Sequence, residues 1–220
     1  MKTADHFQAI LGTIETNGFL LESDPKLPSV VSSITGSALR GSWWSHPLAQ
    51  IIFQVNEMLE DHEDILIAKL VSRKVTFVHR KFWSELAMIG SAREHWQLTD
   101  LRAVTKSLLK QVESAGALST AETVWPQTST MKLGDAAREL EKRLLVVGIQ
   151  FHGESGAHEK RLETWDHWMK RKKFKPAKIS IKTAKSRLEL KLRNLNEQFG
   201  GSATLPWGMT RSVSNSYEAD

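Results

Sequence analysis

Residues 41–83 read GSWWSHPLAQIIFQVNEMLEDHEDILIAKLVSRKVTFVHRKFW. Apolar side chains recur at three- and four-residue intervals over residues 48–59, which predicts a helix with one face against a core. Residues 65–71 and 74–80 are rich in β-branched side chains, so they predict two short strands. The turn between them, residues 72–74, carries two cations. A helix followed by a hairpin with a cationic tip is the outline of a winged helix.

The residues before this stretch predict the other helices of a helix-turn-helix unit. Residues 4–17 carry apolar side chains on one side, and Gly36 is expected to end a short second helix. Pro47 suits the first turn of the helix that follows, where Ser42 and Ser45 are expected to cap free N–H groups. The last helix of such a unit is the recognition helix, which enters a groove of DNA.

The second half of the chain repeats this pattern faintly. Leu59 lies 24 residues before Trp83, and Leu140 lies 25 residues before Trp165. Each interval contains two strand-like runs that follow a helix. This spacing predicts a tandem repeat of the helix–hairpin unit. The alternative is a chance similarity between two helix–hairpin segments.

These patterns predict an α+β fold that is mostly helical. Two tandem winged-helix units are expected over residues 1–95 and 96–175. Residues 176–207 are expected to form a C-terminal basic amphipathic helix and a segment that docks on a core, because their apolar positions have helical spacing. Residues 208–220 are expected to be a disordered tail.

The distribution of charge indicates a nucleic-acid partner. The chain has a formal net charge of +5, but residues 170–193 contain eleven Lys or Arg against one acid, Glu189, and so carry +10. The rest of the chain therefore carries about −5. Such asymmetry is typical of proteins that bind phosphate backbones, because each contact releases condensed counterions. The alternative is a basic helix face that only meets solvent.

Several function classes have no support in the sequence. The chain has no cysteine and no apolar run of the roughly 18 residues that cross a bilayer. The N-terminal residues lack the apolar core of a signal peptide, so a cytoplasmic protein without a membrane partner is expected. The eight histidines show no paired metal-ligand spacing, and no glycine-rich phosphate loop occurs, so neither a metal nor a small-molecule cofactor is expected. The acidic cluster over residues 60–64 is expected to be solvated, and residues 154–158 are expected to form a turn of small residues.

The candidate nucleic-acid-binding residues are cationic, amide or aromatic side chains in the expected recognition helix, wing and basic segment. They are Arg40, Trp43, Trp44, His46, Gln50, Gln54, Arg73, Lys74, Arg80, Lys81, Lys170, Arg171, Lys172 and Lys173. Arg40 and His46 flank a helix start, where free N–H groups can bind a phosphate. Gln50 and Gln54 lie one turn apart, where their amides could read adenine edges. The adjacent tryptophans could stack on bases, although core packing is the alternative.

The same stretch is similar to a known family. Gly41-Ser-Trp-Trp44, a helix that ends in Met58-Leu59-Glu60, and a hairpin that reaches Arg80 before an aromatic residue resemble one winged-helix unit of the AlkZ-type bacterial DNA glycosylases. This resemblance implies tandem winged helices that bind double-stranded DNA and excise alkylated or cross-linked purines without a metal. The similarity extends loosely through the repeat to Trp165-Asp-His-Trp168.

The chain departs from that family in its catalytic element. The glycosylases carry a Gln-x-Asp or Gln-x-Gln tripeptide near the N-terminus, and this sequence contains neither. Gln8 is followed by Ala9 and Ile10, and the nearest imitation, Gln111-Val-Glu113, lies in an ordinary predicted helix. No catalytic residue can therefore be transferred. The resemblance implies a relative that keeps the DNA-binding architecture without the known excision residues.

Three hypotheses follow for the function. The first is a winged-helix protein that binds DNA in repair or regulation, without catalysis. The second is a DNA glycosylase with a divergent active site. The third is a protein-interaction module in which the basic helix meets an acidic protein partner, and its binding would be insensitive to salt.

Overall fold

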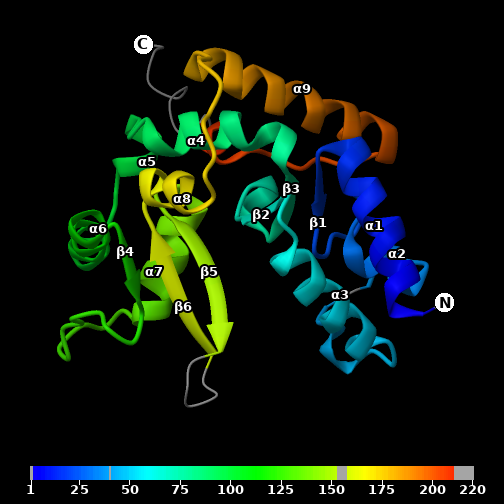
Figure 1. Ribbon diagram of the computed structural model, residues 1–220, viewed down its shortest axis with the longest axis horizontal. Helices are drawn as coiled ribbons and strands as arrows, with labels where there is room; N and C mark the ends of the chain where they lie inside the picture. Colours follow the sequence, from blue (N-terminus) through cyan, green and yellow to red (C-terminus); the bar gives the residue numbers. More distant parts are fainter. Residues whose placement is uncertain (1, 40, 153–157, 211–220) are drawn as a thin grey trace, which may run out of the picture.

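The computed structural model describes residues 2–39, 41–152 and 158–210 of the chain. Two units of similar construction lie on either side of the molecule, and the helices α4 and α9 run across both (Figure 1). The first unit contains α1 (Thr3–Asn17), β1 (Phe19–Leu21), α2 (Val30–Thr35), α3 (Ala49–Asp61), β2 (Ile65–Ala68) and β3 (Thr76–His79). The second contains α6 (Ala103–Ala115), β4 (Ala117–Ser119), α7 (Leu133–Lys142), β5 (Val147–His152) and β6 (His158–Glu163). The helices between and after them are α4 (Trp83–Ser91), α5 (His95–Leu98), α8 (Trp165–Arg171) and α9 (Ile181–Phe199).

Both units contain a three-stranded antiparallel sheet with the same order. The first sheet has the order β1-β3-β2 and the second β4-β6-β5, so the last strand of each hairpin lies in the centre. In the first hairpin Leu66 lies opposite Val78, and in the second Gly148 lies opposite Leu162. The predicted α+β, mostly helical fold class is confirmed, since 55% of the structure is helical. The predicted repeat of a helix followed by a hairpin is present in both halves.

Local sequence signals explain most element boundaries. Gly36 and Gly200 follow α2 and α9 with φ of 78° and 62°, a left-handed conformation that glycine adopts without strain. At the other end of α9 the Ser180 side chain accepts a hydrogen bond from the Thr183 N–H. This N-cap satisfies one of the free donors of the helix.

The start of the central helix differs from the prediction. The helix α3 begins at Ala49, two residues after Pro47, and none of its free N–H groups receives a side-chain cap. Ser42 instead accepts from the N–H of Trp44 and caps a short 3-10 helix, η1 (Trp43–Ser45). The predicted capping of α3 by Ser42 and Ser45 is therefore wrong.

The end of the described chain is ordered further than predicted. Leu205 is buried, which confirms the expected docking of this segment. A 3-10 helix, η4 (Pro206–Thr210), follows it, so the predicted tail over residues 208–220 begins too early. The remainder of that predicted tail, residues 211–220, lies outside the described residues, as does most of the predicted turn over residues 154–158.

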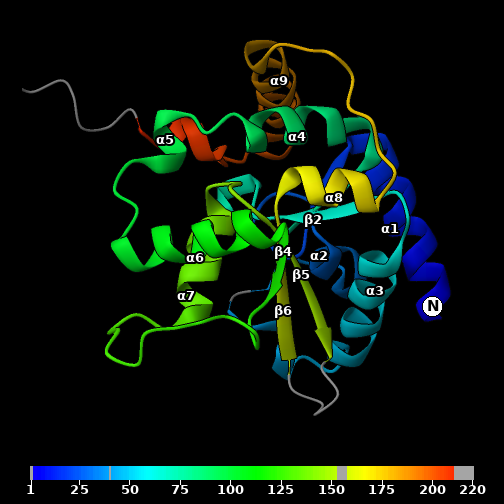
Figure 2. The same cartoon turned by 60° about the vertical axis from the view of Figure 1, so that its left-hand side comes forward.

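Three apolar cores hold the molecule together. One lies within the first unit between α1, α2, α3 and the sheet, and another lies within the second unit between α6 and α7. The third joins the two units, and α9 contributes its apolar stripe to it: Ala184, Leu188, Leu192 and Leu195. Ion pairs fix α9 in place, with Arg187 2.9 Å from Glu85 and Lys185 2.6 Å from Glu94. Figure 2 shows the chain that leaves α8 rising past α4 to reach α9. No helix in the described ranges has the length and apolar character that a membrane span needs.

Candidate functional site

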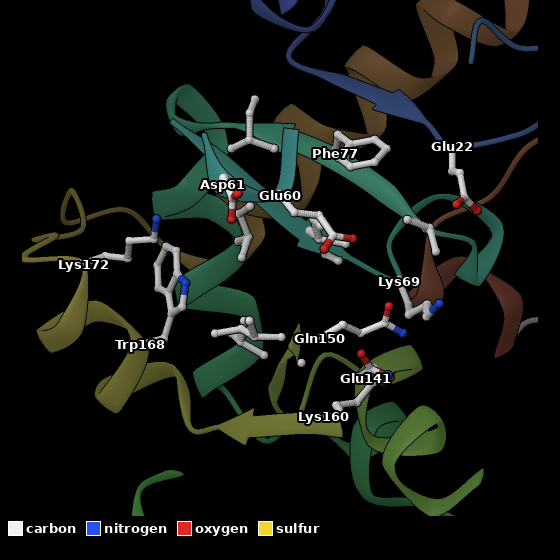
Figure 3. Close-up of a pocket in the computed structure, with 18 of the residues that line it drawn as sticks. Glu22, Glu60, Asp61, Lys69, Phe77, Glu141, Gln150, Lys160, Trp168 and Lys172 are labelled. Atoms are coloured by element: carbon white, nitrogen blue, oxygen red, sulfur yellow. The ribbon is translucent and has the colours of Figure 1, made fainter. Parts of the chain in front are cut away.

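A cleft of about 390 Å³ lies between the two units. Strand β2 and the end of α3 form one wall, and β5, β6 and α7 form the other, with the second half of α8 at one end (Figure 3). The charged side chains that line it are four acids and four bases: Glu22, Glu60, Asp61, Glu141, Lys69, Lys160, Arg171 and Lys172. The lining described here therefore has no net charge.

Aromatic side chains supply the apolar part of the cleft. Phe77 lies in one wall, and Trp168 lies at the end nearest Lys172 (Figure 3). The Trp168 ring is 1% exposed and packs edge-on against Trp83, with the ring centroids 4.9 Å apart.

A glycine makes room for one of the cleft carboxylates. A Cβ atom at position 148 would lie 2.1 Å from Oε1 of Glu141, so only glycine allows this side chain to cross β5 into the cleft. Glu141 is then held by Lys160, whose Nζ lies 2.7 Å from its Oε2. The second unit thus contributes a fixed ion pair to the cleft.

The first unit contributes carboxyl groups that hold protons unusually tightly. Glu60 is exposed to solvent, but partial desolvation in the cleft, together with the negative charges of Asp61 and Glu22, raises its pKa to about 7. Burial also raises the pKa of Glu22, although the positive charge of Lys69 opposes this. The pKa of Lys69 is in turn lowered, again chiefly by burial, against the attraction of Glu141.

The chemical consequence concerns the protonation state at neutral pH. A carboxyl group with a pKa near 7 is present in both its acid and its base forms, so it can donate or accept a proton. Perturbed groups of this kind in a cleft are typical of functional sites. Among the described residues, no three His, Cys, Asp or Glu side chains come together as a metal site.

The structure brings four of the predicted nucleic-acid-binding residues to this cleft. They are Trp43, Trp44, Arg171 and Lys172. Trp43 is 7% exposed, whereas Trp44 is 64% exposed and stacks on it with the ring centroids 4.2 Å apart. One tryptophan is therefore part of the core, and the other presents a ring to solvent at the mouth of the cleft.

Three of the predicted cations are held by the fold. Lys74 lies 2.8 Å from Asp24, and Arg80 lies 3.0 Å from Asp64. Lys81 donates to backbone carbonyls in the last turn of α1, where a positive charge complements the helix dipole. These cations stabilise the first unit, and each offers less charge to a ligand than the sequence alone indicates.

The predicted polar residues around α3 are distributed between structural and exposed positions. His46 accepts the Leu48 N–H through Nδ1 at 3.1 Å. Gln54 is exposed and accepts a hydrogen bond from the Thr3 hydroxyl at 3.0 Å, while Gln50 is exposed. The roles of these residues in reading bases stay predictions.

The remaining predicted residues lie away from the cleft or outside the structure. Arg73 lines a separate cavity at the tip of the first hairpin. Lys170 and Lys173 are exposed on either side of the two cleft cations. Arg40 lies outside the described residues.

Sequence reasoning missed most of the cleft. Glu60 and Asp61 are exposed, as expected, but their place in the lining of a cleft was not predicted, and Glu22, Lys69 and Glu141 had no assigned role. One feature of the sequence could have pointed to the cleft: Lys69, a cation directly after the apolar strand β2. The residues come from elements far apart in the sequence, so no local spacing connects them.

The fold is that of an α+β protein in which two helix–hairpin units line a cleft. A family model described as AlkZ related matches residues 4–201, and the chain therefore belongs to the AlkZ-related family. This confirms the resemblance seen in residues 41–83 and suggests an association with DNA repair. Neither a curated protein nor a solved structure matches the chain.

Proposed function

We propose that the protein binds double-stranded DNA in a repair process through two winged-helix units. The family membership supports this, because the family is named for its relation to the AlkZ-type glycosylases. The order of elements supports it as well, since each unit has a helix before the hairpin and the last hairpin strand in the centre of the sheet. In such a unit α3 is the candidate recognition helix.

The observation that carries the proposal is a set of unpaired cations in residues 170–193, a segment that begins at the cleft. In residues 170–193, Arg171, Lys185 and Arg187 form ion pairs within the protein, and Lys172 lies over the Trp83 ring. The other seven have no ion-pair partner in the described part of the chain: Lys170, Lys173, Lys175, Lys178, Lys182, Lys191 and Arg193. The first of these follow directly from the Trp168 end of the cleft. Phosphates can bind along this segment while a base approaches the cleft.

The test is the salt dependence of binding to a DNA duplex, measured by fluorescence anisotropy on the full chain. A truncation after Trp168 is unsuitable because α9 completes the central core. The variant instead replaces Lys170, Lys173, Lys175 and Lys178 by Ala. Each phosphate contact that is lost should flatten the plot of log affinity against log salt by roughly 0.9.

A matched control variant loses the same four positive charges at other positions. Replacing the exposed lysines Lys26, Lys106, Lys110 and Lys132 by Ala removes four charges outside the basic segment. The control should keep most of the wild-type slope. A salt-independent wild-type affinity would contradict the proposal and favour a protein partner.

A second function is favoured by the pKa of Glu60, namely excision of a damaged base. Hydrolysis breaks the N-glycosidic bond, water supplies the hydroxyl group that joins C1′, and the proton from that water balances the charge on the departing base. In its acid form Glu60 can protonate the leaving base, and in its base form it can take a proton from the attacking water. This assignment uses residues other than the Gln-x-Asp element that the chain lacks.

The excision function predicts release of free base from an alkylated duplex. The rate should change with an apparent pKa of about 7, and Glu60→Gln should lower it by roughly 100-fold or more. Because Glu60→Gln keeps the shape of the side chain and removes only a negative charge, it should not weaken duplex affinity. The absence of free base after a long incubation with excess wild-type protein would rule out this second function and leave DNA binding intact.

A further inference from the structure

A second cavity, of about 400 Å³, lies where the tip of the first hairpin meets the second unit. The tip is the 3-10 helix η2 (Val71–Arg73), and the opposite wall is formed by α7 and the start of α6. Its charged lining consists of Arg73, Arg102, Asp135, Arg138, Glu139, Lys142 and Arg143. None of these residues lines the cleft described above.

The cavity is strongly cationic after its own ion pairs are taken into account. Five cations and two acids give a lining charge of +3. Arg138 lies 2.6 Å from Asp135, which neutralises that acid. Arg143 lies 3.4 Å from Glu139, whose other oxygen accepts the Thr105 hydroxyl at 2.7 Å.

The excess charge belongs to three side chains. Arg73, Arg102 and Lys142 have no ion-pair or hydrogen-bond partner in the described ranges. The Nε atom of Arg73 is moreover buried without an acceptor. Leaving a buried donor of a charged group unpaired costs free energy. An anion bound to this guanidinium would remove that cost.

The backbone holds Arg73 in position before any ligand arrives. Ser72 and Arg73 have φ of 50° and 57°, a left-handed conformation that is unusual for residues other than glycine. The Ser72 N–H donates to the Thr204 carbonyl at 2.7 Å, and the neighbouring Lys74 is held by Asp24 at 2.8 Å. The strained tip is thus fixed on both sides, which lowers the entropic cost of binding.

We propose that this cavity is a phosphate-binding site. The planar guanidinium groups of Arg73 and Arg102 match the oxygens of a phosphate, and Lys142 adds a third positive charge. The site lies beyond the Lys69 end of the cleft, because Arg138 is near enough to Lys69 to lower its pKa. The phosphate can belong to a DNA strand that passes the cleft, in which case the inference rests on the proposed function, or to a small phosphorylated molecule.

The first measurement is calorimetric titration of the full chain with inorganic phosphate. Arg73→Gln and Arg102→Gln should each weaken binding about tenfold or more. Arg102 is exposed and unpaired, so its replacement leaves the fold intact even if the Arg73 change disturbs the tip. The control is Lys110→Gln, which removes an exposed cation of α6 outside both the cavity and the basic segment and should have no effect.

The second measurement identifies the source of the phosphate. Duplex DNA affinity is compared between the wild type and the same three variants, with inorganic phosphate added as a competitor. Loss of affinity in the two cavity variants, together with competition, assigns the site to a DNA phosphate. Weaker phosphate binding with unchanged DNA affinity assigns it to a small phosphorylated molecule.

The outcomes separate this inference from the proposed function. If the wild-type protein does not bind DNA but the cavity variants still lose phosphate, the site stands and the proposed function fails. If Arg73→Gln and Arg102→Gln bind both phosphate and DNA as well as the wild type, the phosphate site is overturned, whatever the basic segment does.

Discussion

The two units have the same strand order, but different interactions stabilise them. The core of the first unit contains fourteen buried apolar residues, and its first strand, β1, is buried throughout. The corresponding core of the second unit contains ten, and its first strand, β4, is only half-buried. The first unit inserts α2 between its first strand and the helix before the hairpin, whereas the second has a loop over residues 120–132.

The most deeply buried ion-pair carboxylate of the two units lies in the second. Glu163 is fully buried in β6 and is approached by Arg161 at 3.2 Å and Arg171 at 2.9 Å. In the first unit the Arg80–Asp64 pair lies at the surface. The same topology can thus be stabilised mainly by apolar burial or partly by buried charge. A unit that contains a buried ion pair is more sensitive to replacement of its carboxylates.

The largest effect is expected where the units meet. Gly90 in α4 lies against Trp165, and an added Cβ would be 1.9 Å from Nε1 of that ring. The ring cannot move away without losing its hydrogen bond to the Leu144 carbonyl, which is 2.7 Å long. Gly90→Ala should therefore lower the free energy of unfolding by about 3 kcal/mol, measured by urea denaturation.

A second glycine provides the control for this change. Gly12 lies in α1, and an added Cβ would meet nothing within 4 Å. Gly12→Ala should raise the free energy of unfolding by roughly 0.5–1 kcal/mol, because alanine favours the helix. Equal effects of the two substitutions would show that the units do not pack through Gly90.

The next effect tests the role of buried charge in the second unit. Glu163→Gln removes the carboxylate and leaves Arg171 and Arg161 without their partner. Because both arginines are partly exposed, the free energy of unfolding should fall by about 2 kcal/mol, less than for a fully buried pair. Asp64→Asn, the matched change at the surface pair of the first unit, should cost about 0.5 kcal/mol. Similar losses at both sites would remove the distinction between the units.

A smaller effect concerns the pH dependence that the cleft imposes on the first unit. The pKa of Glu60 is raised from 4.5 to about 7, so the folded state binds a proton more tightly than the unfolded state. The stability associated with this proton is complete below pH 4.5 and is lost as the pH rises through 7. Glu60→Gln should be more stable than the wild type by about 1 kcal/mol at pH 8, because solvent screens part of the shift.

The measurement for this variant is thermal unfolding of both proteins from pH 4 to pH 8. The difference between them should be small at the acid end and grow as the pH rises toward neutrality. Stability curves that run parallel over this range would show that the cleft does not perturb Glu60.

The smallest effect is expected at the tip of the first hairpin. Burial tends to raise the pKa of Asp24, but hydrogen bonds from Lys74, Leu27 and Lys26 outweigh it, and the pKa is lowered. Lys74→Ala should cost about 0.5 kcal/mol at neutral pH, since the lysine is largely exposed. The difference should disappear well below pH 3.8, where Asp24 is protonated in both proteins, and denaturant titrations at two pH values would detect this. A constant difference would show that the pair contributes nothing electrostatic.

Much of the fold could be predicted because it depends on local periodicity and stop signals. The apolar spacing in α1 and α9, and the glycines after α2, α6 and α9, set the boundaries that the structure shows. The start of α3 could not be predicted from capping residues, because Ser42 caps the short helix η1 and α3 begins at Ala49 without a side-chain cap.

The candidate sites were far less predictable than the fold. Counting charge indicated the basic segment, but only the structure shows that Arg171, Lys185 and Arg187 are already paired. The raised pKa of Glu60 comes first from desolvation and from Asp61, and Glu22, which is distant in sequence, adds to it through space. A local sequence motif cannot predict a contact between residues that are distant in the sequence.

The return of residues 203–207 to the first hairpin has a consequence for biosynthesis. The central core contains both Phe19 and Leu205. During synthesis its N-terminal apolar residues therefore stay uncovered until the C-terminal ones have been made. At roughly 5–20 residues per second, this delay is on the order of 10 s or more during translation. The first unit can fold on the ribosome around its own core, while its face toward α9 stays open to chaperones. Assembly of the whole molecule is therefore a late, non-local event, and synthesis rate should influence its yield.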